Sequence, residues 1–247
     1  MTSEAPAARF FFVHVMRTGG TTFEQQLRKN FPRAEVYPNP DLDFPNGDVL
    51  HHLDVDYLLG LPAERLAAIR FFYGHFPFVA TQMLDPAIVT LTVLRDPVER
   101  TISLMRVLRE QRPALRERTL EQIYDDEQMF PRLIHNHQTK LFSMTAGDHP
   151  RSYRDEIEVD GARLALAQEN LARVNLIGIT ERYGEFLAML RDRLGWRLSE
   201  EARMNAATEV HEESPGLRRR IATDNAIDMD FYEFGRDLVA ERRRSST

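Results

Sequence analysis

The segment FFFVHVMRTGGTT (residues 10–22) joins an apolar run directly to a polar turn. Its aromatic and β-branched residues predict a buried strand over residues 10–15. Gly19 and Gly20 then allow a tight turn whose backbone N–H groups can come close to a ligand. The two threonines that follow are suited to begin a helix, because threonine is a favoured N-cap residue. A strand, a tight turn and a helix N-terminus in this order predict an anion site.

The segment IVTLTVLRDPVERTIS (residues 88–103) repeats this architecture. Its first seven residues predict a second buried strand. Asp96 is placed to cap the next helix, and Pro97 is placed to be its first residue, where proline is favoured. The chain therefore contains two strand-to-helix turns of the same kind.

Cationic side chains accompany both turns. Arg17 lies in the first turn, and Arg95 lies at the end of the second strand. Arg100 and Ser103 are three residues apart, so they share one helix face and can join Arg95 in a phosphate clamp. A plain strand–turn–helix connection with solvated arginines explains either segment alone, but the pair favours a ligand with anionic groups at both ends. The G-x-x-x-x-G-K-[ST] motif of ordinary P-loop nucleotidases is not present in the sequence.

Further apolar runs predict strands at residues 69–73 and 174–179, with a shorter one at 35–37. Proline and glycine predict a loop over residues 37–48. Helical patterns lie between the strands, over residues 21–30, 62–68, 97–111, 119–144, 161–172 and 181–194. Apolar strands that alternate with helices predict an α/β fold, with a parallel sheet of about four or five strands flanked by helices. Both turns would then lie at the carboxyl ends of strands, where such sheets bind ligands.

The bulk composition limits the class of protein. The 247 residues fit one domain, residues 1–247, with a core over about 10–196 and a helical extension over about 197–247. The net charge of −6 argues against a nucleic-acid-binding surface. The chain has no cysteine, which excludes thiolate metal sites and disulfides and favours a reducing compartment. Without a signal-peptide pattern or a long apolar run, we expect a cytoplasmic protein with no membrane span.

The two turns resemble the signatures of sulfotransferases that use 3′-phosphoadenosine 5′-phosphosulfate (PAPS). The nearest match is the group that includes the heparan sulfate uronyl 2-O-sulfotransferases and their bacterial relatives. Its first signature, approximately P-K-T-G-G-T-T, corresponds to MRTGGTT at residues 16–22. Its second, approximately L-R-D-P-x-x-R-x-x-S, matches residues 94–103.

Three further segments support the same resemblance. YGHFP at residues 73–77 matches a glycine–histidine element between the two signatures. NHQTK at residues 136–140 is similar to the family's N-x-Q-T-[RK] segment, and GITERY at residues 178–183 is similar to G-[IL]-T-E-R-F. The resemblance therefore covers about residues 10–196 and implies a P-loop-like sulfotransferase fold with a helical C-terminal half.

The resemblance implies a PAPS donor and no required metal. The 5′-phosphosulfate would lie at the first turn, Arg95 and Ser103 would hold the 3′-phosphate, and Thr180 would lie near the nucleotide. The first-turn residues so implied are Arg17, Thr18, Gly19, Gly20, Thr21 and Thr22. Arg17 departs from the family, which usually has a lysine that contacts the bridging oxygen and helps catalysis. Arginine keeps the charge but differs in reach and geometry.

Histidines supply the candidate general base. His75 follows a predicted strand end and matches the histidine proposed as base in related 2-O-sulfotransferases. An unperturbed imidazole titrates near neutrality, as a general base requires. A structural histidine after a turn glycine is the alternative. His51 and His52 are expected in the acceptor pocket or as solvated loop residues, and His137 and Gln138 are also candidates for acceptor binding. His14, inside the first strand, is expected in the core.

The function that these residues predict is sulfuryl transfer from PAPS to a hydroxyl of a small-molecule, glycan or lipid-like acceptor by in-line displacement. A kinase or other phosphoryl transferase is the alternative enzyme, but it usually has a P-loop lysine and a magnesium carboxylate. A catalytically inactive nucleotide-binding protein is the third possibility, because Arg17 replaces the usual lysine. The sequence does not select an acceptor or an oligomeric state.

Overall fold

The computed structural model of the chain describes residues 8–27, 29–44, 54–85, 87–199 and 213–245. Five parallel strands form one sheet in the order β2-β3-β1-β4-β5. The strands are β1 (Phe10–Val13), β2 (Val36–Tyr37), β3 (Phe71–Gly74), β4 (Val89–Leu94) and β5 (Leu176–Ile179). The predicted parallel α/β fold is thereby confirmed, and each predicted strand is present.

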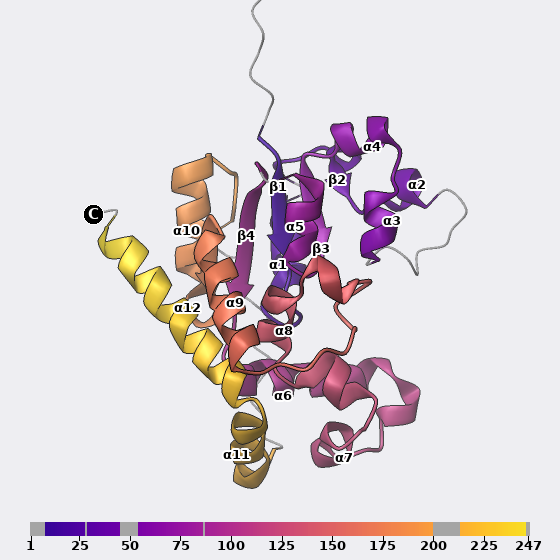
Figure 1. Ribbon diagram of the computed structural model, residues 1–247, viewed down its shortest axis with the longest axis vertical. Coiled ribbons are helices and arrows are strands. Elements are labelled where there is room, and N and C mark those ends of the chain that lie inside the picture. Colours follow the sequence, from indigo (N-terminus) through magenta and orange to yellow (C-terminus); the bar gives the residue numbers. More distant parts are fainter. Residues whose placement is uncertain (1–7, 28, 45–53, 86, 200–212, 246–247) are drawn as a thin grey trace, which may run out of the picture.

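Helices cover the sheet and extend beyond its carboxyl edge (Figure 1). In chain order they are α1 (Gly20–Leu27), α2 (Pro40–Asp43), α3 (Val55–Leu59), α4 (Ala63–Ala68), α5 (Val79–Leu84), α6 (Pro97–Gln111), α7 (Leu120–Tyr124), α8 (His137–Ser143), α9 (Gly161–Arg173), α10 (Tyr183–Leu194), α11 (Pro215–Asp224) and α12 (Ala226–Arg244). No helix in the described ranges is long and apolar enough to cross a membrane.

The sheet has a hydrophobic core on each face, because successive strand residues point to opposite sides. Phe11 and Val13 pack in the core shared with α6, α8, α9 and α12. Phe10 and Phe12 pack in the core shared with α1 and α10, which Trp196 closes. Burial on both faces explains why the strands read as near-continuous apolar runs.

The prediction of one long helical stretch over residues 119–144 is wrong. The structure has α7, then a π-helix over Phe130–Ile134, then α8. Asn136 adopts a left-handed conformation with φ of 44°, which interrupts the helical backbone before α8. The break turns α8 so that its first residues face the carboxyl edge of the sheet.

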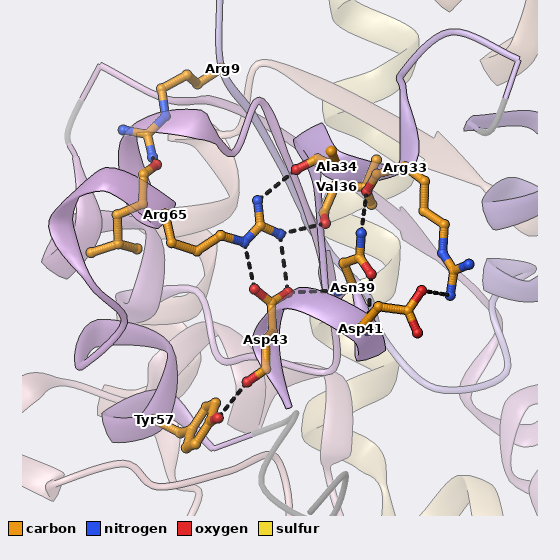
Figure 2. A network of polar contacts seen from close by, with 10 residues as sticks. Arg9, Arg33, Ala34, Val36, Asn39, Asp41, Asp43, Tyr57 and Arg65 are labelled. Atoms are coloured by element: carbon orange, nitrogen blue, oxygen red, sulfur yellow. Dashed lines mark hydrogen bonds and ion pairs between the residues drawn. The ribbon is translucent and has the colours of Figure 1, made fainter. Parts of the chain in front are cut away.

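Residues 37–44, expected as a loop, include the short helix α2 and a buried ion pair (Figure 2). The Asp43 carboxylate lies 2.5 Å from Nε of Arg65 in α4, and the same guanidinium donates to the carbonyls of Ala34 and Val36. Tyr57 in α3 donates its hydroxyl to the Asp43 carbonyl. These contacts connect four elements at the outer edge of the sheet, namely β2, α2, α3 and α4.

The C-terminal helices pack against the core. Helix α12 lies beside α9 (Figure 1) and approaches β4 so closely that a Cβ at Gly235 would lie 2.5 Å from Leu94. In the last turn of α12, Arg242 donates to the carbonyls of Ala172 and Val174, so this arginine binds the end of α9 instead of extending into solvent.

Candidate active site

The two predicted turns lie side by side, because β1 and β4 are neighbours in the parallel sheet. The Arg95 guanidinium donates to the backbone carbonyl of Arg17 at 3.0 Å. Nε of Arg17 donates to the hydroxyl of Ser103, in α6, at 3.2 Å. Three residues that the sequence assigned to opposite ends of a ligand therefore form one connected group.

The backbone of the first turn is unusual. Arg17 has φ of 68°, a left-handed conformation that is uncommon for a residue with a side chain, and Gly19 has φ of 97°. Such conformations persist where surrounding contacts hold them, often at functional sites. Here Arg95 holds the Arg17 carbonyl, and the Thr18 hydroxyl donates to the Val15 carbonyl at 2.8 Å.

The two guanidiniums at the turns are partly buried. Burial lowers the pKa of Arg17, and the nearby Arg95 cation lowers it further. Burial also lowers the pKa of Arg95, although the carboxylates of Glu181, Glu99 and Asp96 oppose this. Both guanidiniums remain charged at neutral pH because arginine titrates far above it. Two partly desolvated cations held together favour an anion between or beside them.

Threonine hydroxyls at the first turn are used within the protein. Thr18 bonds to Val15 as above, and the Thr180 hydroxyl donates to the Thr18 carbonyl at 3.3 Å. Thr180 thus joins β5 to the turn, close to where a nucleotide was expected. Thr22 lies partly exposed in the first turn of α1, whereas the side chain of Thr21 lies outside the described part of the structure. Backbone N–H groups and the guanidiniums of Arg17 and Arg95 are therefore the main hydrogen-bond donors that this region presents to a ligand.

Gly20 begins α1 and has no room for a side chain. A Cβ at this position would lie 1.8 Å from Nε2 of His14. The imidazole of His14 is therefore packed against the first residue of the helix. As expected, His14 is a core residue, and its burial holds its pKa well below the ordinary value, with His75 and Arg17 adding to that effect.

Gln138 and Asp228 support the second turn. Gln138 accepts from the Arg95 N–H at 3.2 Å and donates to the Arg95 carbonyl at 2.8 Å. The buried Asp228 carboxylate, in α12, accepts from the N–H groups of Gln138 and Thr139. Gln138 is fully buried and occupied with the backbone, so the structure gives it a supporting position and not a contact with an acceptor.

Arg100 does not belong to the group that Arg17, Arg95 and Ser103 form, which corrects its expected place in the phosphate clamp. It is 0% exposed and donates to the carbonyls of Leu133 and Ile134 in the π-helix. Lys140, at the end of the NHQTK segment, donates to the two preceding carbonyls, of Pro131 and Arg132. Burial lowers the pKa of Arg100 to about 10 and that of Lys140 to about 8. Both cations satisfy carbonyls that the break before α8 leaves without helical partners.

His75 lies just after β3, on the other side of β1 from β4. Its Nδ1–H donates to the His14 carbonyl at 2.8 Å. Its partly exposed ring stacks on the His14 ring, with centroids 4.2 Å apart, and tilts against the Tyr153 ring at 5.1 Å. His75 and the group formed by Arg17, Arg95 and Ser103 therefore lie next to each other at the carboxyl ends of the parallel strands.

The other histidine candidates differ in accessibility. His137 is 0% exposed and packs edge-on against Tyr153, with centroids 6.3 Å apart, so an acceptor cannot reach its ring. Burial and the nearby Arg100 cation lower its pKa well below the ordinary value. His51 and His52 lie outside the described residues.

Sequence reasoning missed several residues of this region. Tyr153 comes from the segment between α8 and α9, where no motif or periodicity singled it out. Glu181 accepts from the Asp96 N–H at 3.1 Å and from the Tyr232 hydroxyl at 2.8 Å, and the Tyr183 hydroxyl approaches the Gly19 carbonyl at 3.5 Å. Glu181 and Tyr183 lie within the GITERY segment, so that motif was the one available signal.

A surface pocket of about 580 Å³ adjoins the second turn, between the start of α6, the end of β5 and the C-terminal helices. Its walls mix cationic, acidic and apolar side chains, namely Asp96, Val98, Glu99, Ile179, Glu181, Arg182, Arg218, Arg219, Ala222, Tyr232 and Arg236. Among the described residues there is no group of three or more histidines or carboxylates arranged to hold a metal.

The fold and these contacts define a parallel α/β protein in which Arg17, Arg95 and Ser103 form one group at the carboxyl ends of the central strands. His75 lies beside this group. No protein-family model matches the chain. It is 27% identical to human galactose-3-O-sulfotransferase 3 and 29% identical to the mouse protein of that name. The bovine protein is 27% identical. Each alignment covers 90% of this chain and 54% of the relative, so the chain spans about half the length of these curated relatives.

These relatives support the wider sulfotransferase class. The more specific resemblance to heparan sulfate 2-O-sulfotransferases rests on the sequence motifs alone. The similarity covers 90% of this chain, so it extends over most of the sheet and its flanking helices.

Proposed function

We propose that this chain is a sulfotransferase that transfers the sulfuryl group of PAPS to a hydroxyl of a glycan. The observation that carries the proposal is the contact of Arg17 with both Arg95 and Ser103. Two motifs far apart in the sequence thereby form one cationic group, which suits a donor that carries several anionic groups. The similarity to galactose sulfotransferases over 90% of the chain supports the same class.

The first turn would receive the 5′-phosphosulfate. Arg17 would neutralise the phosphate that leaves, and backbone N–H groups of residues 18–22 would donate to its oxygens. Arg95 and Ser103 would hold the 3′-phosphate, and Thr180 would border the nucleotide from β5. The guanidinium of Arg17 offers several donors in a planar fork, so it suits a phosphate oxygen pair.

The transfer itself requires a base and an in-line approach. The acceptor oxygen would attack sulfur as the bond between sulfur and the bridging phosphate oxygen breaks, which releases 3′,5′-adenosine bisphosphate. His75 would take the hydroxyl proton, because it is partly exposed at the carboxyl ends of the strands, next to the group that contains Arg17 and Arg95. The positive charge of Arg17 would stabilise the negative charge that develops on the leaving group.

A glycan that ends in galactose is the first acceptor that we propose, because the relatives are named for galactose 3-O-sulfation. His51 and His52 remain candidates for contact with this acceptor.

Calorimetric titration with 3′,5′-adenosine bisphosphate tests the donor site. We expect binding that weakens when Ser103 is replaced by alanine and that is tighter than binding of ATP. The control is Ser199→Ala, because Ser199 contacts the Gln26 side chain in α1 through its backbone N–H, which alanine retains. Tighter binding of ATP would support the competing phosphoryl transferase and overturn the proposal.

Turnover separates an enzyme from an inactive nucleotide-binding protein. We expect transfer of labelled sulfate from PAPS to lactose-type or N-acetyllactosamine-type acceptors, and strong loss of transfer in His75→Gln with little change in donor affinity. If the chain binds the donor but transfers sulfate to no glycan in a broad acceptor panel, the protein is a catalytically inactive nucleotide-binding protein.

A further inference from the structure

We propose that His14 and Tyr153 form an imidazole clamp, which fixes His75 in one ring orientation and one neutral tautomer, with the lone pair on Nε2. Both are positioning residues, since they would act through His75. The proposal rests on the proposed role of His75 as base, and it adds the structural device that would make this histidine effective.

The backbone hydrogen bond determines the tautomer. A carbonyl oxygen only accepts, so the 2.8 Å contact between Nδ1 of His75 and the His14 carbonyl requires the proton to be on Nδ1. In the neutral imidazole the lone pair then lies on Nε2. A general base needs an unprotonated ring nitrogen, because that nitrogen must take the proton of the acceptor hydroxyl.

The His14 ring holds one face of His75. The two rings are nearly parallel, with an interplanar angle of 27° and centroids 4.2 Å apart. His14 is itself immobilised, because it stacks on Phe12 and Tyr73 and packs against Gly20 at the start of α1. The same ring therefore contacts the first anion turn and the base candidate, and it sets their separation.

Tyr153 makes a second ring contact with His75, from a different part of the chain. Its ring tilts by 49° against His75 with centroids 5.1 Å apart, and only 6% of the residue is exposed. Arg154 fixes the tyrosine, since its guanidinium lies over the ring and its Nε donates to the hydroxyl at 2.9 Å. His137 packs against the tyrosine edge.

Hydrogen bonds hold the segment that carries Tyr153 both before and after this residue in the sequence. The Arg151 carbonyl accepts from the N–H of Val55 in α3 at 2.8 Å. The Asp155 carboxylate accepts from the N–H groups of Arg151 and Ser152, which closes a turn around the tyrosine. An aromatic side chain on such a closed turn loses little further conformational freedom when it holds a neighbouring ring.

The first test measures the tautomer directly in the full chain. Nitrogen-15 NMR of labelled histidine distinguishes a protonated from an unprotonated ring nitrogen, and His75→Gln assigns the signal by its disappearance. We expect neutral His75 to show a protonated Nδ1 and an unprotonated Nε2. A predominant Nε2–H form in the wild-type chain would overturn the clamp, whether or not the protein transfers sulfate.

The second test removes the ring of Tyr153. We expect Tyr153→Leu to mix the tautomers of His75 and to lower kcat by about 10- to 100-fold, with donor affinity changed by less than about twofold. Tyr153→Phe keeps the ring and should retain the tautomer and most of kcat. Phe130→Leu is the matched control, because Phe130 stacks on a different histidine, His135, with centroids 5.2 Å apart.

Folding is checked separately by melting temperature. If Tyr153→Leu does not fold, His14→Leu gives the same test through the second ring contact of His75. A folded variant of either kind with the wild-type tautomer and wild-type kcat would overturn the clamp. Failure of the proposed function looks different: the donor does not bind or His75→Gln retains full activity, while the tautomer of His75 is still measured as described.

Discussion

Arg17 combines an unfavourable backbone with a favourable charge. A left-handed conformation costs a residue with a side chain roughly 1–2 kcal/mol, and glycine avoids most of this cost. Arg17 adopts that conformation with φ of 68°, where its side chain reaches Ser103 and its carbonyl accepts from Arg95. The residue is therefore better explained by ligand binding than by stability.

Arg17→Gly should separate these two effects. We expect a melting temperature equal to or above that of the wild type, and an affinity for 3′,5′-adenosine bisphosphate lower by about 10-fold or more because the guanidinium is lost. Differential scanning fluorimetry and calorimetric titration measure the two quantities. His149→Gly is the control, since His149 has φ of 48° but makes none of the contacts that hold the first turn, so it should change stability without affinity. Unchanged affinity in Arg17→Gly would contradict our interpretation of the turn.

Gly20→Ala tests the close approach of His14 to α1. An alanine Cβ would overlap the imidazole at 1.8 Å from Nε2, so we expect a loss of unfolding free energy of about 1–3 kcal/mol in urea titrations. Gly184→Ala is the control, because a Cβ there meets nothing within 4 Å and lies in α10, where alanine is the better helix former. Equal stability of the two variants would show that His14 moves away freely.

Element-scale contacts explain why the break before α8 is tolerated. The π-helix ends with carbonyls that Arg100 and Lys140 bind, and the first N–H groups of α8 are bound by Asp228 of α12. Burial raises the pKa of Asp228, while the Arg100 cation opposes this. Removal of one of these side chains would leave buried polar groups without hydrogen-bond partners. The free energy lost in this way exceeds the net stabilisation that one hydrogen bond provides.

The stability of the chain should therefore depend on pH through Lys140. Its pKa is about 8 in the folded chain and near 10.5 when exposed, so between these values the unfolded chain binds more protons. The unfolding free energy contributed by this lysine should rise as pH increases from about 8 toward 10. Lys140→Met should flatten this rise in urea titrations at several pH values. An identical pH slope in both proteins would contradict the lowered pKa.

At the scale of the whole molecule, α12 links the core to the active-site edge. Phe231 is fully buried and packs on Phe142 of α8, with centroids 5.4 Å apart, while Asp228 on the same helix holds the start of α8. The helix thereby positions Gln138, which holds the backbone of Arg95. The C-terminal extension is a part of the structure that shapes the site.

Phe231→Ala should show this dependence. We expect a loss of about 3–5 kcal/mol of unfolding free energy from the lost packing and the cavity left behind. Donor affinity at low temperature should fall as well, because α8 no longer fixes Arg95. Leu42→Ala is the control, since Leu42 is 51% exposed and packing there is small. A destabilised Phe231→Ala variant with unchanged donor affinity would show that α12 stabilises the core without shaping the site.

Much of this architecture was predictable from local patterns. Strand β1, the turn at Arg17 and the cap at Asp96 follow from apolar runs, glycines and capping residues within a few positions of each other. The break at Asn136 was not predictable in this way, because the helical pattern continues through it and buried cations stabilise it. The expected loop over residues 37–48 missed α2 because a distant arginine, Arg65, holds the acidic side chain of that helix.

The sequence by itself determined the parallel sheet, the order of the two turns and the presence of Arg17, Arg95 and Ser103 at them. Only the tertiary structure decided that Arg100 and Lys140 bind carbonyls, that Gln138 holds Arg95, and that Tyr153 flanks His75. The physical reason is distance along the chain. Strand, turn and cap preferences act between near neighbours, whereas the partner of a buried charge or ring is determined by how separate elements pack.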